Sequence, residues 1–131
     1  MKRILPIFLI LFLLLPLSGC RTTYTLRESA NTITQIELVS AEDCFEYTVV
    51  KTLSETEKED FLNRIQYTEF RRRIGDPIRL RGDSIKITYE SGNYDIICGH
   101  ASEYVKDGER YYNPSICDKD AFVALFNDYS D

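Results

Sequence analysis

The stretch that decides the fold is SIKITYESGNYDIIC, Ser84 to Cys98, in which two runs rich in apolar residues flank a short polar turn. The spacing of β-branched and aromatic residues is typical of strands, and the glycine between the runs indicates a tight turn. A turn at Ser91-Gly92 places three apolar pairs on one face, namely Tyr89–Tyr94, Ile87–Ile96 and Ile85–Cys98. A turn at Gly92-Asn93 sets Glu90 opposite Asp95, and like charges disfavour that register. We therefore predict an antiparallel hairpin that turns at Ser91-Gly92.

A second hairpin is predicted directly downstream, in EYVKDGERYY, Glu103 to Tyr112. Asp107-Gly108 suits a type I′ turn, because glycine tolerates positive φ and aspartate is among the residues that also adopt it. This turn sets Lys106 opposite Glu109 and Tyr104 opposite Tyr111, so that an opposite-charge pair and an aromatic pair support the same register.

Two amphipathic helices are predicted, one on each side of these hairpins. The first begins at the capping box Ser54-Glu55-Thr56-Glu57, in which the Ser54 hydroxyl and the Glu57 carboxylate each bind the other residue's backbone N–H, and it runs to about Gln66. The second is capped by Asp118 and carries apolar residues at helical spacing: Phe122, Leu125, Phe126 and Tyr129. Both helices have one apolar face to bury.

The fold class that these elements predict is α+β, an antiparallel sheet of hairpins with both helices on one face, in the order ββ-α-ββββ-α. Alternating residues predict an upstream hairpin from Thr32 to about Val49 and a strand over Tyr67 to Ile74. Residues 32–131 are expected to form a single small domain. The polar stretch from Arg21 to Asn31 lacks periodicity, so residues 20–31 are expected to form a tether to it.

The N-terminus has the pattern of an export signal. Lys2 and Arg3 precede an apolar run from Ile4 to Leu17 that only two prolines interrupt. As a helix this run would be about 21 Å long, shorter than the hydrocarbon core of about 30 Å, which favours a signal peptide over a permanent span.

The sequence Leu17-Ser18-Gly19-Cys20 resembles the lipobox of bacterial lipoproteins. The resemblance implies cleavage between Gly19 and Cys20, removal of residues 1–19, and a diacylglyceryl group on the Cys20 thiol. Two or more acyl chains hold a protein stably on a membrane, so the resemblance implies a lipid-anchored protein on the extracytoplasmic face of the cell membrane. An ordinary secretory signal, with Cys20 later in a disulfide, is the alternative. The rest of the chain is similar only to small uncharacterised lipoproteins, which transfers no further residue role.

The charge of the mature chain argues against nucleic acid as a partner. Loss of Lys2 and Arg3 leaves 14 basic and 21 acidic groups, a formal charge of −7. Nonspecific nucleic-acid binding depends on basic groups that neutralise phosphates, and an acidic domain also discourages flat contact with an anionic membrane. The expected partners are therefore the membrane, through Cys20, and an unknown envelope or extracellular protein or ligand.

Three cysteines remain besides the lipidation site, Cys44, Cys98 and Cys117. An exported chain permits a disulfide, but an odd number leaves at least one free thiol. Cys98 with Cys117 is the preferred pair, since one ends a strand and the other precedes a helix, and a fully reduced chain is the alternative.

No catalytic, metal or cofactor site is predicted from the motifs. His100 is the single histidine, and as a general base it would need a partner such as Glu103 or Asp95. No nucleophile motif surrounds it, so a plain loop histidine is favoured over a small envelope hydrolase. The sequence also lacks CxxC, HxxxH and HExxH, which leaves no zinc constellation.

A binding surface is the preferred functional interpretation. Tyr104, Tyr111 and Tyr112 gather around one turn, and tyrosine gives large contact area with a polar tip at low entropic cost. Arg71 and Arg73 belong to the one basic cluster of the acidic domain and could bind carboxylates or phosphates. We therefore expect a binding or interaction module without catalysis, with the hydrolase and an inhibitor or immunity-type protein as alternatives.

Overall fold

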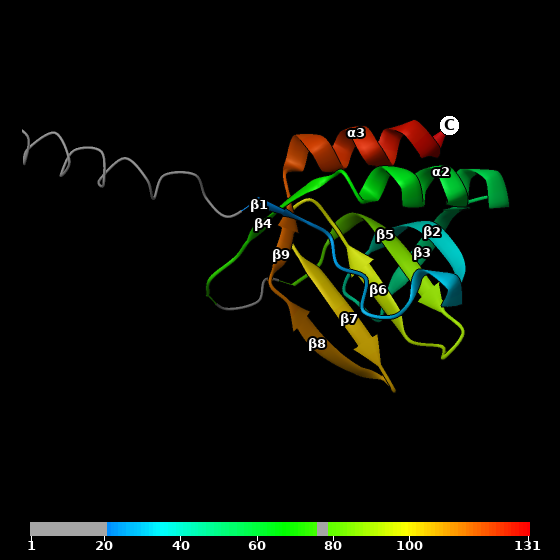
Figure 1. The fold of residues 1–131 in the computed structure, drawn as a ribbon. Coiled ribbons are helices and arrows are strands. Elements are labelled where there is room, and N and C mark those ends of the chain that lie inside the picture. Colours follow the sequence, from blue (N-terminus) through cyan, green and yellow to red (C-terminus); the bar gives the residue numbers. More distant parts are fainter. Residues whose placement is uncertain (1–20, 76–78) are drawn as a thin grey trace, which may run out of the picture.

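The computed structural model of this protein describes residues 21–75 and 79–131 (Figure 1). The expected signal peptide and its lipobox lie outside the described residues. The elements follow in the order β1 (Arg21–Thr23), η1 (Ala30–Thr32), β2 (Ile33–Ala41), β3 (Tyr47–Thr52), α2 (Glu55–Ile65), β4 (Glu69–Arg72), β5 (Gly82–Tyr89), β6 (Tyr94–Ile97), β7 (Ser102–Lys106), β8 (Glu109–Asn113), β9 (Ser115–Cys117) and α3 (Lys119–Ser130).

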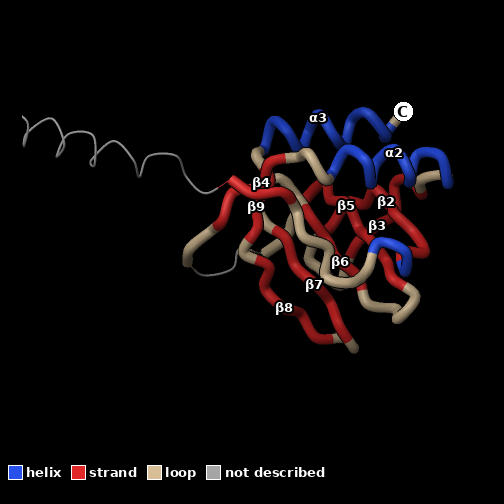
Figure 2. The backbone as a smooth tube through the Cα atoms, viewed as in Figure 1, coloured by secondary structure: helices blue, strands red, loops and turns tan. Residues whose placement is uncertain are grey.

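The strands form two sheets in which every neighbouring pair is antiparallel. The larger sheet has six strands in the order β3-β2-β5-β6-β7-β8, and the smaller has three in the order β1-β4-β9. The two helices lie side by side over the larger sheet (Figures 1 and 2). The predicted α+β class is confirmed; the observed order has β1 at the start and six strands between the helices, where the predicted order has four.

Both helices begin where the sequence predicts. Ser54 and Glu57 form the complete capping box, with the Ser54 backbone N–H donating to Glu57 Oε2 at 2.8 Å. Asp118 caps α3 by accepting from the Asp120 backbone N–H at 3.1 Å. All four apolar residues predicted for the inner face of α3 are buried, and Tyr129 packs edge-on against Phe61 of α2 with ring centroids 5.8 Å apart.

The hairpin of β5 and β6 forms, but the predicted register is wrong. Ile87 pairs with Asp95 and Lys86 with Ile96, so the two strands are shifted by one residue from the expected pairing. Gly92, with φ of +84°, closes a three-residue connection in which the Tyr89 backbone N–H donates to Asn93 O at 3.0 Å. A shift of one residue moves each β6 side chain to the other face relative to β5. Asp95 is therefore on the same face as Ile87.

The segment expected as a tether packs on the domain instead. Residues 21–23 form β1, which pairs with β4, and Tyr24 is buried against Phe70 with ring centroids 4.9 Å apart. Leu26 also packs against the core. Residues 21–26 therefore belong to the domain, because pairing with β4 and packing of Tyr24 and Leu26 on the core hold this segment in place.

Candidate functional site

The predicted tyrosine group lies on the β7–β8 hairpin, whose register is the predicted one. Tyr104 pairs with Tyr111 and Lys106 with Glu109. Asp107 and Gly108 have φ values of +52° and +79°, as the type I′ turn requires. The rings of Tyr104 and Tyr111 are tilted, with centroids 6.2 Å apart, so the two side chains form one aromatic surface beside the turn.

This surface forms one wall of a depression of about 460 Å³, which we call the hairpin recess. Its lining residues are Arg27, Tyr104, Lys106, Tyr111 and Tyr112. Arg27 reaches the recess from the segment between β1 and η1, and its guanidinium donates to Tyr112 O at 3.4 Å. The recess therefore joins the side chains of Tyr104 and Tyr111 to two cations, whereas Tyr112 is paired with Glu103 and directs its side chain to the other face of the hairpin.

Hydrogen bonds hold Tyr104 in a fixed orientation. The Tyr104 hydroxyl donates to Glu28 Oε1 at 2.9 Å and accepts from the Asn93 side-chain amide at 3.1 Å. Asn93 and Ser91 also donate to Glu28, each at 2.8 Å, and these bonds hold the pKa of the Glu28 carboxyl below its usual value. The phenol of Tyr104 is thus fixed by a carboxylate, whereas Tyr111 is 46% exposed and available for contact.

Two cations line the recess, and the carboxylates of Glu28 and Glu109 bind the hydroxyls of its tyrosines. Neither Arg27 nor Lys106 forms an ion pair with a carboxylate in the described part of the chain. Their charges are consequently available to a ligand. Arg27 was not predicted because it lies in the segment expected as a tether; Tyr24 and Leu26, apolar residues two positions apart just before it, were the available signal.

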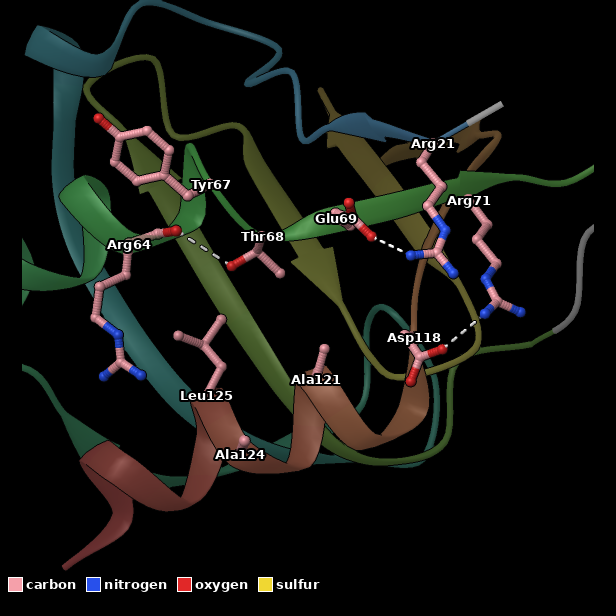
Figure 3. Close-up of a pocket in the computed structure, with 10 residues that line it drawn as sticks. All are labelled: Arg21, Arg64, Tyr67, Thr68, Glu69, Arg71, Asp118, Ala121, Ala124 and Leu125. Atoms are coloured by element: carbon pink, nitrogen blue, oxygen red, sulfur yellow. Dashed lines mark hydrogen bonds and ion pairs between the residues drawn. The ribbon is translucent and has the colours of Figure 1, made fainter. Parts of the chain in front are cut away.

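Arg71 and Arg73 are not part of the hairpin recess. They lie on and just beyond β4 in the smaller sheet, and Arg71 lines a separate groove of about 480 Å³ against α3. Figure 3 shows that groove, with ion pairs from Arg21 to Glu69 and from Arg71 to Asp118, the latter at 3.0 Å. The structure therefore separates the predicted arginines from the predicted tyrosines.

The arginines of this groove are compensated by neighbouring carboxylates. Besides the pairs drawn in Figure 3, Arg64 pairs with Asp128 and donates to the Tyr129 hydroxyl at 3.3 Å. The groove floor is mainly apolar, with Ala121 and Leu125 among its residues. Because its positive charges already have partners, the groove attracts an anion less strongly than the hairpin recess does.

On the larger sheet, the face opposite to Ile85 and Ile87 buries a charged pair, Lys86 and Glu37, that was not predicted from the sequence. Lys86 Nζ is 3.6 Å from Glu37 Oε2 and donates a hydrogen bond to the Tyr47 hydroxyl. It also lies 4.4 Å and 4.6 Å from the ring centroids of Tyr47 and Tyr94. These contacts compensate a buried cation and stabilise the sheet.

His100 does not meet the carboxylates that the hydrolase alternative needs. Its ring nitrogens lie 3.5 and 3.7 Å from Cys98 Sγ, and the side chain is exposed. Glu103 is paired with Arg110, and Asp95 is buried on β6. Burial raises the pKa of the Cys98 thiol, whereas a nucleophilic cysteine needs a lowered pKa.

The three cysteines of the described domain are free, buried thiols. Burial raises the pKa of Cys44 to about 12 and that of Cys117 to about 11. The disulfide between Cys98 and Cys117 stays a prediction. Across residues 21–75 and 79–131, no three histidine, cysteine or carboxylate side chains gather as metal ligands would.

Comparison of this chain with family models, with curated proteins and with solved structures finds no match.

Proposed function

We propose that this protein is a lipid-anchored, extracytoplasmic binding module whose hairpin recess receives an acidic segment of a partner protein. The observation that carries the proposal is the recess itself, which joins Tyr104 and Tyr111 to Arg27 and Lys106, two cations with no ion pair to a described carboxylate. Tyrosine supplies contact area, and guanidinium and ammonium groups bind carboxylates. Cations without an ion pair on an acidic domain also steer a negatively charged segment toward themselves.

The lipid anchor is supported by the N-terminal pattern. The basic start, the apolar run and Leu17-Ser18-Gly19-Cys20 occur in the order that a lipoprotein signal requires. In the described ranges, neither helix has the length and apolarity that a membrane crossing requires. An anchor on Cys20 would then be the attachment of the domain to the membrane.

Replacement of the lipidation site tests the anchor. In cells fed a labelled fatty acid, the Cys20→Ala protein should carry no label and should leave the membrane fraction, whereas Cys44→Ala should label like the wild type. Equal labelling of Cys20→Ala and the wild type would overturn the anchor, because no acyl group would then depend on the Cys20 thiol.

Peptide binding tests the recess. The probes are two fluorescent peptides that alternate leucine with glutamate or with glutamine, and binding is measured by anisotropy at low salt. The glutamate peptide should bind more tightly, and Arg27→Gln/Lys106→Gln should weaken it about tenfold, since two exposed ion pairs each contribute up to about 1 kcal/mol. The matched control Arg72→Gln/Arg73→Gln removes the same charge elsewhere and should bind like the wild type.

Two results would overturn the recess proposal. Equal binding of the glutamate and glutamine peptides would show that the cations of the recess do not select charge. Equal weakening by the recess variant and by the matched control would show that only the net charge of the domain matters.

A further inference from the structure

The N-terminal strand enters the domain beside the arginine run of β4. Arg21 of β1 pairs with Arg71 of β4, and the two strands are antiparallel. The chain therefore leaves Arg21, toward residue 20, in the direction in which β4 continues to Arg72, Arg73 and Ile74. Figure 1 shows the start of β1 and the far end of β4 on the same side of the molecule.

This side of the domain carries basic side chains that the domain does not use. Arg72 is exposed and Arg73 half-buried, and neither forms an ion pair with a carboxylate of the described residues. Arg21 and Arg71 are paired with Glu69 and Asp118, so Arg72 and Arg73 are the arginines of this side without a carboxylate partner among the described residues.

An apolar side chain projects just beyond these arginines. Ile74 is 97% exposed, the highest value among the exposed large hydrophobic residues described. In water such a position gains nothing from an isoleucine, whereas at a membrane interface the side chain can leave water. Charge and apolar exposure thus coincide at the end of the domain where the chain leads to residue 20.

We propose that this end of the molecule, the anchor-side patch of Arg72, Arg73 and Ile74, lies against the membrane and binds anionic phospholipid headgroups. The inference rests on the proposed lipid anchor and adds an orientation to it. An anchor on residue 20 would attach within one residue of β1, since consecutive Cα atoms are about 3.8 Å apart. Arginines held at this distance from the lipid surface pair with phosphates, and Ile74 enters the interface between headgroups and acyl chains.

The patch reconciles a basic contact with an acidic domain. The net charge of the mature chain is negative and would repel an anionic surface if the charges were evenly spread. Charges farther from the membrane than the Debye length of about 8 Å are largely screened, so the residues nearest the anchor decide the interaction. Those residues include Arg72 and Arg73, which form no ion pair within residues 21–75 and 79–131.

A single tryptophan at position 74 tests the orientation, because the natural chain contains none. The mature chain with Ile74→Trp is coupled through Cys20 to a maleimide lipid in vesicles of phosphatidylcholine, with or without phosphatidylglycerol. Coupling is selective for Cys20, because the other three thiols are buried. The readout is quenching of tryptophan fluorescence by phospholipids brominated in their acyl chains. The control is Val50→Trp, which is 55% exposed on the edge strand β3.

We expect strong quenching of Trp at position 74, weak quenching at position 50, and an increase at position 74 when phosphatidylglycerol is present. Arg72→Gln/Arg73→Gln should abolish the increase, since each arginine near an anionic surface changes the contact equilibrium about fivefold. Arg27→Gln/Lys106→Gln removes the same charge from the hairpin recess and should leave the increase unchanged.

The proposal is overturned if position 74 is quenched no more than position 50, or if the phosphatidylglycerol effect survives loss of both arginines. Chemical coupling makes this test independent of native acylation. Failure of the patch and failure of the Cys20→Ala labelling test are therefore separate results.

Discussion

Asp95 offers the sharpest test of the buried structure, because its carboxyl is buried with only one of its two oxygens hydrogen-bonded to described residues. Asp95 is completely buried on β6, where its Oδ2 accepts from the Tyr89 hydroxyl and from the Arg27 backbone N–H at 3.3 Å. Oδ1 has no hydrogen-bond partner among the described residues. Burial raises the pKa of Asp95 from the ordinary value of 3.8 to about 6, although the hydrogen bonds from Tyr89 and Arg27 act in the opposite direction.

The sign of the effect on stability follows from this raised pKa. The folded protein keeps the proton on Asp95 up to about pH 6, whereas the unfolded chain releases it near pH 3.8. The stabilising contribution is therefore fully present below pH 3.8 and is lost as the pH rises through 6. The difference between the two pKa values corresponds to about 3 kcal/mol of unfolding free energy.

We predict that Asp95→Asn removes this pH dependence. Asparagine stays neutral, and its side-chain oxygen can still accept from Tyr89. Its amide group would lack an acceptor at the position of Oδ1, which costs about 1–3 kcal/mol at every pH. The unpaired amide group lowers the stability of the variant, whereas the lack of an ionisable group raises it at neutral pH. The difference in unfolding free energy from the wild type should therefore shift by about 3 kcal/mol in favour of the variant between acidic and neutral pH.

Urea denaturation followed by circular dichroism measures this difference at several pH values. The control is Glu57→Gln, which should show the opposite sign, because hydrogen bonds from Ser54 and Lys51 lower the pKa of Glu57 to about 2. The stabilising contribution of Glu57 is present above its ordinary value of 4.5 and is lost as the pH falls through about 2. A constant free-energy difference between Asp95→Asn and the wild type across the range would refute the reasoning on Asp95.

Three further substitutions test the core, a helix cap and the buried ion pair. Phe61→Ala should lower the unfolding free energy by about 3–5 kcal/mol in urea titrations, because the ring is completely buried, and a loss below about 1 kcal/mol would contradict that burial. Ser54→Ala should cost about 1 kcal/mol by loss of the cap of α2, and replacement by threonine should restore most of it. Lys86→Met should lower the unfolding free energy by about 3 kcal/mol, because Glu37 is left buried without its partner. The double variant Glu37→Leu/Lys86→Met should recover stability. A double variant no more stable than the single one would contradict the ion pair.

Features governed by neighbours in the sequence could be predicted. The capping box of Ser54 and Glu57, the Asp118 cap and the Asp107-Gly108 turn all depend on groups within three residues of one another. The hairpin that carries the tyrosines was predicted in its correct register for this reason. Its turn and its opposite-charge pair both favour one alignment.

The β5–β6 register could not be chosen by the apolar pattern, because both faces of these strands are buried. Ile85, Ile87 and Tyr89 are buried on one face, and Ile96 is buried on the other beside Lys86. When polar and apolar residues are covered alike, alternation no longer distinguishes inside from outside. The Glu37 and Tyr47 side chains that compensate Lys86 come from β2 and β3 and are not visible in the local sequence.

The short N-terminal strand was missed for a similar reason. β1 has three residues, and it is held by pairing with β4, almost fifty positions later in the chain. Pairing with β1 and β9 places β4 in the smaller sheet, whereas the tyrosines lie on β7 and β8 of the larger sheet. Arg71 is separated from the tyrosines for this reason. Only Tyr24 and Leu26, apolar side chains in a polar stretch, indicated that the segment packs on the core.

The same pairing sets the distance between the two proposed surfaces. The open end of the β7–β8 hairpin adjoins β9, whose Ser115 pairs with Arg72 at the anchor-side patch. From that end, five-residue strands extend to the turn after Lys106, a length of about 15 Å. A domain that rests on Arg72 and Arg73 would therefore hold the hairpin recess away from the headgroups. Lipid contact and binding of an acidic partner would then occur together, because the two surfaces use different cations: Arg72 and Arg73 at the end of β4, and Arg27 and Lys106 at the recess.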